Sequence, residues 1–521
     1  MTAEVSPPAR RSFLRVGVAD FVFVFFALAI LQRAGSGIVD DPGLGWHIRI
    51  ADAMTEKGGF LDSDPFGQPT RGEPWVPFGF LGSAALRLAD GWGGLDALAM
   101  LAALTIAFTL RCLYRMMVTD GVPPVQAVAW TFLAALGVST AWVARPNVFT
   151  LLFFLVTARV CVQWHRDRIS ARKTLWLLPL FAVWANTHGG WAAGLLTIAG
   201  AGLAELGLAA WDRGARPAAL GRFRWFVLLG AGCGLATLVN PSGPRMHLQV
   251  LRLMGDPFMM NLNDDWLSWD FHALGSFRLE LLILLLPLLL AWSRYRPDAV
   301  SLALAVLWLH LGLNGRRYAP LWVLVTVPTL ARLTAQLPVV ERVGEWLSEK
   351  HPDVVPPASP SRSRAPWLWT AVAAVVLFGS TRYYGGYARH HPDDLPAPAL
   401  DKLLEVHQGE KVFHSINWGG YLTWHGWNKD PRFLVWIDDR NELYGRERIE
   451  EWMTISAARP GWREALERHG FGLICVPKES GLAYRLAEEP GWERLYADDA
   501  AVIYRRARPG PIDSPSGRTH P

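Results

Sequence analysis

The strongest constraint on this chain is a series of long apolar runs that carry almost no charge. Residues 16–32 contain one charged residue, Asp20, and residues 279–292 contain only Glu280. A helix needs about 20 such residues to cross roughly 30 Å of hydrocarbon, and it must be helical because no water there can bond the backbone. The whole chain is 19% charged, against about 25% in soluble domains. The sequence therefore predicts an α-helical polytopic membrane protein.

About eleven membrane spans are predicted from the lengths of the apolar runs. They cover residues 16–34, 94–117, 124–144, 147–164, 174–187, 190–211, 223–240, 277–293, 298–314, 318–335 and 366–384. No small-residue cleavage site directly follows the first run. We therefore expect an uncleaved first helix rather than a signal peptide.

The distribution of Lys and Arg predicts the orientation, because short cytoplasmic loops carry an excess of these residues. With the N-terminus in the cytoplasm, the basic residues that lie inside include Arg166, Arg168, Arg172, Lys173, Arg213, Arg216, Arg222, Arg224, Arg294 and Arg296. The outer loops carry acids instead, namely Asp40, Asp41, Asp62, Asp64, Asp256, Asp264, Asp265 and Asp270. An odd number of spans places the C-terminal segment in the periplasm of a bacterial inner membrane. The same pattern explains the net charge of +5, so we expect no nucleic-acid partner.

The C-terminal segment differs in composition from the rest and is predicted to be a soluble α/β domain over residues 385–508. Strands are expected at 411–414, 433–437, 472–476 and 500–505, and helices at 443–457 and 461–469. The predicted transmembrane bundle covers 1–352, with its first outer loop at 35–93. A cytoplasmic linker at 353–365 leads to the last span at 366–384, and 509–521 is expected to be a disordered tail.

The first outer loop gathers side chains that can carry chemistry: Asp40, Asp41, Trp46, His47 and Arg49. Two adjacent carboxylates can hold a hard divalent cation, such as Mg²⁺ or Mn²⁺, or act as a general base. The alternative is that both acids form a solvated helix end. We predict that Asp40, Asp41 and His47 are catalytic and that the two acids are the candidate metal ligands.

Polar residues also mark the outer ends of later spans. They are Arg145, Asn186, His188, Asn240, Asp265, Trp266, Arg316 and Arg317. Polar side chains at membrane depth are costly, which favours a functional role, although each could instead cap a helix or anchor it at the interface. Arginine contacts phosphate in a bidentate manner, so Arg145, Arg316 and Arg317 are predicted to bind a lipid-linked phosphate. The others, with Trp46 and Arg49, are predicted to line the substrate cavity.

These motifs together resemble a bacterial family of glycosyltransferase-like membrane proteins of the GT-C superfamily. The matching segments are DDPGLGWHI (40–48), ARPNVF (144–149), WANTHGGW (184–191), NPSG (240–243), DDWLSWDF (264–271), GRRYAP (315–320), VFHSINWGGYLTW (412–424) and VWIDDRNELYG (435–445). They cover most of the chain in register with the predicted spans. Two departures stand out: Gly43 occupies a position that is frequently acidic in relatives, and Phe78-Gly79 replaces a His-Glu pair.

The resemblance implies transfer of a sugar, a hexose or a pentose, from a polyprenyl-phosphate donor to a glycan, lipid or protein acceptor outside the cytoplasm. The acid of the first outer loop, here Asp40 or Asp41, would deprotonate the acceptor, often with a divalent metal. Arg145 and Arg316 or Arg317 would stabilise the leaving phosphate. The polyprenyl chain would lie in a groove between spans.

The C-terminal motifs allow two interpretations each. Trp418 and Tyr421 flank a glycine pair that can form either a sugar-binding edge or a tight packing turn. Asp438, Asp439 and Arg440 end a predicted strand and can bind a ligand, or Arg440 can form a structural ion pair with an acid. Two other functions stay open for the whole chain: a flippase for lipid-linked saccharides, and a non-catalytic scaffold of envelope polysaccharide assembly. No internal repeat is found, whereas transporters favour inverted repeats, so the enzyme is preferred.

Overall fold

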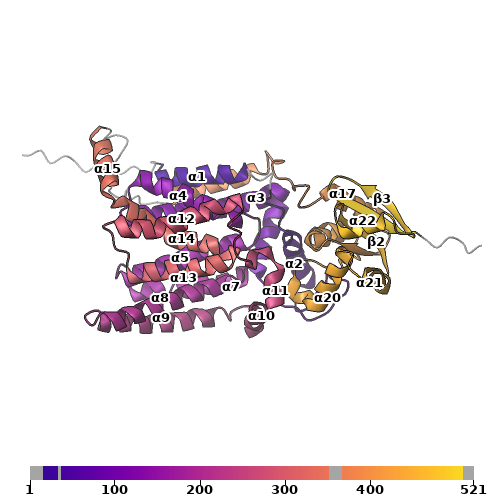
Figure 1. Cartoon of the computed structure of the whole chain (residues 1–521), viewed down its shortest axis with the longest axis horizontal. Helices are drawn as coiled ribbons and strands as arrows, with labels where there is room; N and C mark the ends of the chain where they lie inside the picture. Colours follow the sequence, from indigo (N-terminus) through magenta and orange to yellow (C-terminus); the bar gives the residue numbers. More distant parts are fainter. Residues whose placement is uncertain (1–15, 33–36, 351–366, 508–521) are drawn as a thin grey trace, which may run out of the picture. The chain divides into compact units, whose positions relative to one another are not determined.

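The computed structural model describes residues 16–32, 37–350 and 367–507. The predicted linker at 353–365 and tail at 509–521 lie outside these residues. The chain divides into two compact units (Figure 1). Unit 1 comprises residues 1–34, 78–250 and 260–388, and unit 2 comprises residues 35–77, 251–259 and 389–521.

Unit 1 is a bundle of long helices that run side by side (Figure 1). A helix occupies each predicted span: α1 (Val18–Leu31), α3 (Phe80–Thr119), α4 (Pro124–Gly137), α5 (Asn147–His165), α7 (Leu177–Thr187), α8 (Trp191–Trp211), α9 (Arg216–Ala236), α12 (Phe277–Trp292), α13 (Ala299–Asn314), α14 (Ala319–Ala335) and α16 (Leu368–Ser380). Shorter elements join them: η1 (Ser139–Ala141), α6 (Ala171–Thr174), α10 (Pro244–Gly255, which ends in unit 2), η2 (Asp264–Trp266), η3 (Leu274–Ser276), η4 (Arg316–Tyr318) and α15 (Pro338–Lys350).

Three of the described helices, α3, α5 and α8, are long and apolar enough to cross a membrane by length and composition. Helices α1, α4, α13 and α16 are apolar but shorter. Helix α14 forms the centre of the bundle, because it packs against α3, α4, α5, α12 and α13 and is buried along nearly its whole length. A helix that is apolar all round is expected in such a position.

Helix α3 is kinked where two glycines interrupt it. Gly94 has φ +59°, a conformation that costs glycine little and other residues much. The predicted span began at residue 94 and therefore matches the second segment of α3. The first segment, from Phe80, lies within the residues predicted as the first outer loop; it is helical and belongs to unit 1.

Charged side chains inside the bundle are paired with one another. Asp20 on α1 accepts hydrogen bonds from Arg111 on α3 (3.3 Å) and from Thr370 on α16 (2.6 Å). Burying a charge is costly unless it is paired and hydrogen-bonded. The single acid of the first predicted span therefore fixes α1 against two other helices.

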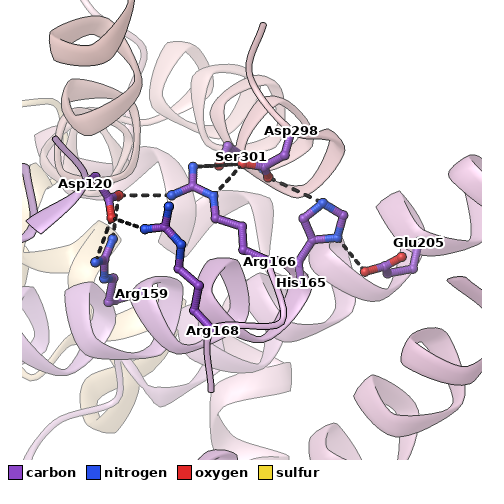
Figure 2. A network of polar contacts seen from close by, with 8 residues as sticks. All are labelled: Asp120, Arg159, His165, Arg166, Arg168, Glu205, Asp298 and Ser301. Atoms are coloured by element: carbon purple, nitrogen blue, oxygen red, sulfur yellow. Dashed lines mark hydrogen bonds and ion pairs between the residues drawn. The ribbon is translucent and has the colours of Figure 1, made fainter. Parts of the chain in front are cut away.

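A larger polar network joins the helix ends that carry the basic residues assigned to the cytoplasm (Figure 2). Asp120, which follows α3, accepts hydrogen bonds from Arg159, Arg166 and Arg168 at 2.7–3.0 Å. Arg166 also bonds Asp298, the N-cap of α13, at 2.9 Å. These contacts bind the ends of α3, α5 and α13 together, so part of the predicted cytoplasmic positive charge also has a structural role.

Unit 2 contains a four-stranded mixed sheet, in the order β1-β2-β4-β3, with helices around it. Its elements are α2 (Leu44–Lys57), α11 (Pro257–Leu262, which begins in unit 2), α17 (Ala397–Val406), β1 (Lys411–His414), η5 (Ile416–Trp418), α18 (Gly419–Tyr421), η6 (Leu422–Gly426), α19 (Trp427–Lys429), α20 (Asn441–Ser456), α21 (Trp462–His469), β2 (Phe471–Pro477), α22 (Gly481–Leu486), β3 (Trp492–Ala497) and β4 (Ala501–Arg506). Strands β1 and β2 are parallel, whereas β4 pairs antiparallel with both β2 and β3. The predicted strands at 411–414, 472–476 and 500–505 correspond to β1, β2 and β4.

The strand predicted at 433–437 is wrong, although the segment is buried. Its backbone is extended, but Val435 bonds Phe66 and Gln68 of the first loop rather than a strand of the sheet. The apolar run correctly predicted that the segment is buried. Its hydrogen-bond partners, however, lie in the first loop, far away in the sequence. Strand β3 and helices α17 and α22 were not predicted.

The first loop thus folds within unit 2. Helix α2 packs against η6 and α18, and the approach is so close that a Cβ built on Gly420 would lie 1.9 Å from the carbonyl oxygen of Pro42. A Cβ on Gly45 would lie 2.0 Å from the carbonyl oxygen of Gly420. The glycine pair at 419–420 therefore serves close packing.

Candidate functional site

Arg317 is the most distinctive predicted phosphate ligand in unit 1. It lies in η4, between α13 and α14, and η4 is tied to the segment after η2 by a hydrogen bond from Arg316 N–H to the Leu267 carbonyl (3.0 Å). The guanidinium of Arg317 stacks on the ring of Trp266 at 4.0 Å. Among the described residues it makes no hydrogen bond or ion pair, so stacking orients it while its N–H donors remain available. A stacked guanidinium is preorganised for bidentate contact with phosphate.

His188 lies beside this arginine, at the junction between α7 and α8. Trp184 donates a hydrogen bond to Thr150 Oγ1 (2.9 Å), which leaves the Thr150 hydroxyl to donate to His188 Nδ1 (2.9 Å). The Gly190 N–H also donates to Nδ1 (3.0 Å). Because Nδ1 accepts both bonds, the hydrogen of the neutral ring must sit on Nε2.

The electrostatics of this group favour an anion. Burial, followed by the charges of Arg317 and Arg145, lowers the pKa of His188 to about 3. Burial also lowers the pKa of Arg317, with the charge of Arg145 acting in the same direction and Tyr318 and Asp265 opposing it. Two guanidinium groups and a neutral N–H donor are therefore close together, a combination that suits phosphate. We call Arg145, His188 and Arg317 the cationic cluster.

Other predicted residues of unit 1 bond their own helix ends. Asn186 donates to the carbonyls of Ala182 and Val239 at 2.7 and 2.6 Å. Asn240 donates to the carbonyl of Thr237 and accepts from the backbone of Ser242. Both asparagines thus satisfy backbone groups left open at helix termini. Asp265 is exposed.

An apolar cavity of about 370 Å³ lies between α8 and α9 of the same unit. Its lining includes Leu195, Ile198, Leu203, Phe223 and Val227, and among these Leu203 and Val227 are exposed at the surface. It begins one helical turn beyond Trp191, the first residue of α8. Its size and lining suit a hydrocarbon chain.

In unit 2, Asp40 is held by the start of the C-terminal segment. Its Oδ1 lies 2.9 Å from Nδ1 of His390, and its Oδ2 accepts the backbone N–H of His391 at 3.0 Å. His390 was not predicted. The only signal was its position in a His-His pair shortly after the last apolar run.

Asp41 lies next to a second carboxylate, that of Asp439 in the C-terminal segment. Asp41 accepts the Gly43 N–H at 2.9 Å, and Asp439 accepts the indole N–H of Trp46 at 2.6 Å. A Cβ built on Gly43 would lie 3.0 Å from an oxygen of Asp41 and 3.2 Å from one of Asp439. The space where an acidic side chain at residue 43 would begin is therefore bordered by an acid from the C-terminal segment.

The other predicted residues of the first loop are largely enclosed. His47 is buried and stacks on Trp46, with ring centroids 3.8 Å apart. Arg49 pairs with Asp52 (3.3 Å) and Glu56 (3.2 Å) and lies 4.5 Å from the Trp427 ring. These contacts orient α2 within unit 2.

Asp438 and Arg440 form a structural ion pair, the second of the two interpretations that the sequence allows. Arg440 pairs with Asp438 and with Asp64 of the first loop, both at 2.6 Å, and all three side chains are fully buried. Trp418 and Tyr421 belong to the hydrophobic core of the domain and bond the Asp394 carbonyl and Asp401, respectively. None of these four C-terminal residues presents an accessible polar group to a ligand in this arrangement.

The donor set does not fit the predicted divalent metal. Within the described residues, no group of three or more His, Cys, Asp or Glu side chains could hold a metal ion. Asp40 directs both oxygens to donors of residues 390–391. We therefore assign no metal ligand in the first loop.

Comparison with known proteins finds solved structures of similar fold. No protein-family model matches the chain, and no curated protein matches it. The structure is similar to the oligosaccharyltransferase AglB from Archaeoglobus fulgidus, solved with an inhibitory peptide and a dolichol-phosphate (TM-score 0.54, 11% identity, 95% of this chain and 75% of that one). It is also similar to apo ArnT from Cupriavidus metallidurans (TM-score 0.51, 15% identity, 93% and 97%).

These matches confirm the predicted resemblance at the level of the fold. AglB and ArnT are GT-C glycosyltransferases, and the similarity extends over most of the chain. The apolar helices and these matches make this protein a multi-pass membrane protein. At these identities the similarity shows the fold alone.

Proposed function

We propose that this protein is a membrane glycosyltransferase that moves a hexose or pentose from a polyprenyl-phosphate donor to an envelope acceptor outside the cytoplasm. The observation that carries the proposal is Arg317, stacked on Trp266 with its hydrogen-bond donors not used by the described residues. A guanidinium in that state is a ready ligand for an anion. The GT-C fold makes a lipid phosphate the natural anion.

The cationic cluster would act most strongly in the transition state. As the bond between sugar and phosphate breaks, negative charge grows on the leaving phosphate oxygen. Donors already aimed at that charge stabilise it without reorganisation. Arg145 and Arg317 supply positive charge, and His188, neutral because of its lowered pKa, supplies an N–H. Arg316 is the third predicted phosphate ligand.

The lipid part of the donor would lie in the cavity between α8 and α9. A polyprenyl chain is pure hydrocarbon, and the residues lining the cavity are apolar. Placing the chain there leaves the phosphate toward the outer end of α8, where His188 lies three residues before the first residue of the helix. This arrangement explains why such an enzyme would have to be built in a bilayer.

The acceptor hydroxyl would be deprotonated at the acids of the first loop, Asp40 and Asp41, which supply or position the general base. We propose that all eleven predicted spans cross the inner membrane, with the N-terminus in the cytoplasm and the C-terminal domain in the periplasm. The domain would help to select the glycan, lipid or protein acceptor. Because the first loop and residues 389–507 share one folded unit, point variants test this better than deletion of the domain.

The test is mass spectrometry of envelope glycans and lipid-linked intermediates from cells that carry the wild-type protein, a gene deletion, or Arg317→Ala. We expect one sugar to be missing from a glycan in the deletion, and the loss of Arg317 to lower transfer roughly 10²–10³-fold. The polyprenyl-phosphate sugar should accumulate in both. Arg278→Ala is the matched control, since this arginine makes a solvent-exposed hydrogen bond to Ser139 and is not among the charges that lower the pKa of His188.

The outcomes separate the alternatives. A deletion that changes no glycan excludes the transferase. A deletion that removes the sugar while Arg317→Ala, present in the membrane at normal amounts, retains it would mean that the cationic cluster does not bind the donor phosphate. Accumulation of the lipid-linked sugar only on the cytoplasmic face would favour the flippase.

A further inference from the structure

The pairing of Asp40 with His390 bears on which atom accepts the proton in the proposed reaction. A carboxylate oxygen can only accept a hydrogen bond, so Nδ1 of His390 carries the hydrogen in the 2.9 Å contact with Asp40. In the neutral ring, Nε2 then keeps its lone pair. Within the described residues, no hydrogen bond engages Nε2.

The carboxylate itself is less well placed to act directly. Both Asp40 oxygens are engaged, one by His390 and the other by the His391 N–H. The Asp40 side chain is 4% exposed, against 11% for His390. A carboxylate enclosed behind an imidazole typically fixes the tautomer and orientation of that ring.

The surroundings of His390 hold the ring in place. Its edge packs against Tyr421, with ring centroids 5.7 Å apart, and Tyr421 is anchored by a hydrogen bond to Asp401. His425 stacks on the same Tyr421 ring, and burial lowers the pKa of His425 to about 4, so it stays neutral beside His390. Among the described residues, the titratable groups near His390 include Asp40, Tyr421 and His425, with Asp401 behind Tyr421.

We propose that His390 is the proton acceptor of the transfer reaction and that Asp40 positions it; this rests on the proposed function. The acceptor hydroxyl oxygen forms a bond to the anomeric carbon as the bond from that carbon to the phosphate oxygen breaks. The bonding electrons leave with the lipid phosphate, and the hydroxyl proton moves to Nε2 of His390. The C-terminal segment then contributes a catalytic residue in addition to any role in acceptor choice.

The experiment compares variants in a transfer assay with purified full-length protein. Cells lacking the gene supply both the unspent lipid-linked donor and the unmodified acceptor. His390→Asn keeps a donor toward Asp40 but has no basic nitrogen, so we expect kcat to fall roughly 10²-fold or more while KM for the donor stays within about threefold. Asp40→Asn should also lower kcat. The kcat of the double variant should be no lower than that of the less active single variant, because the two residues act as a unit.

Imidazole added to His390→Ala should restore activity in a concentration-dependent way, which a purely structural role would not allow. His407→Asn, a histidine bonded to the Glu410 carbonyl in the same domain, is the matched control and should retain wild-type activity. If His390→Asn stays within tenfold of the wild type while Asp40→Asn is inactive, Asp40 itself is the base and the inference is wrong. Wild-type protein that transfers no sugar would instead remove the proposed function.

Discussion

Burial sets the protonation state of single histidines in this protein. His414 is fully buried at the end of β1; Trp436 N–H donates to its Nε2 at 3.3 Å, and its Nδ1 lies 2.9 Å from the Ser415 carbonyl. Both contacts suit the neutral ring. Burial lowers the pKa of His414 to about 4, with the Ser415 carbonyl and Asp438 opposing the shift.

This shift predicts acid sensitivity of unit 2. The folded pKa of His414 lies below the ordinary value near 6.5, so its contribution to stability is complete above pH 6.5 and is lost as the pH falls toward 4. The loss amounts to about 3 kcal/mol at most. His414→Gln should therefore show a flatter dependence of the melting temperature on pH between 7 and 4 than the wild type. Parallel curves would show that another group causes the acid sensitivity.

A buried ion pair and an exposed one should differ sharply in cost. Arg440 is fully buried with Asp64, whereas Arg448 and Glu73 are both about one-third exposed or more. Asp64→Asn leaves a buried charge with one partner fewer and should lower the free energy of unfolding by about 3–5 kcal/mol. Glu73→Gln should cost at most about 1 kcal/mol. Chemical unfolding of unit 2 measures both, and equal costs would contradict this assignment of burial.

Among the secondary-structure elements, close approach of backbones decides how α2 meets the segment at 419–426. Gly420→Ala would place a Cβ 1.9 Å from the Pro42 carbonyl oxygen. The clash is with backbone and cannot be relieved by a rotamer change, so we expect a loss of more than about 2 kcal/mol. Gly59→Ala, where a Cβ meets nothing within 4 Å, is the control. Protease resistance of the first loop should fall in the first variant only.

The prediction of elements succeeded where the signal was local. Apolar length located α5, α8 and the other helices of the bundle, and short apolar runs located β1, β2 and β4. It failed at 433–437, where an apolar run is equally compatible with a strand and with an extended segment. Only the position of residues 66–68 decides between them, and that is not a local property.

For the bundle as a whole, the polar network of Figure 2 should contribute more to stability than its location in short loops and helix ends suggests. Asp120 accepts bonds from three arginines, and its side chain is 3% exposed. Asp120→Asn removes the charge they share, and we expect the free energy of unfolding of the bundle to fall by about 3–5 kcal/mol. Asp167→Asn, at an exposed acid 3.5 Å from Arg222, should change it by less than about 1 kcal/mol. Thermal unfolding in detergent compares the two, and a similar melting temperature for both would show that the network is not stabilising.

The sequence alone determined that this protein is a multi-spanning helical bundle with an α/β domain, because apolar length and periodicity act within a few turns of chain. It also located the polar residues at the helix ends, since such residues are costly in a membrane wherever they occur. The tertiary structure decided how they are used. Asp40 meets His390 350 residues later, Trp46 meets Asp439 393 residues later, and Asp64 meets Arg440 376 residues later. Pairs so distant depend on which surfaces pack together, and no local pattern encodes that.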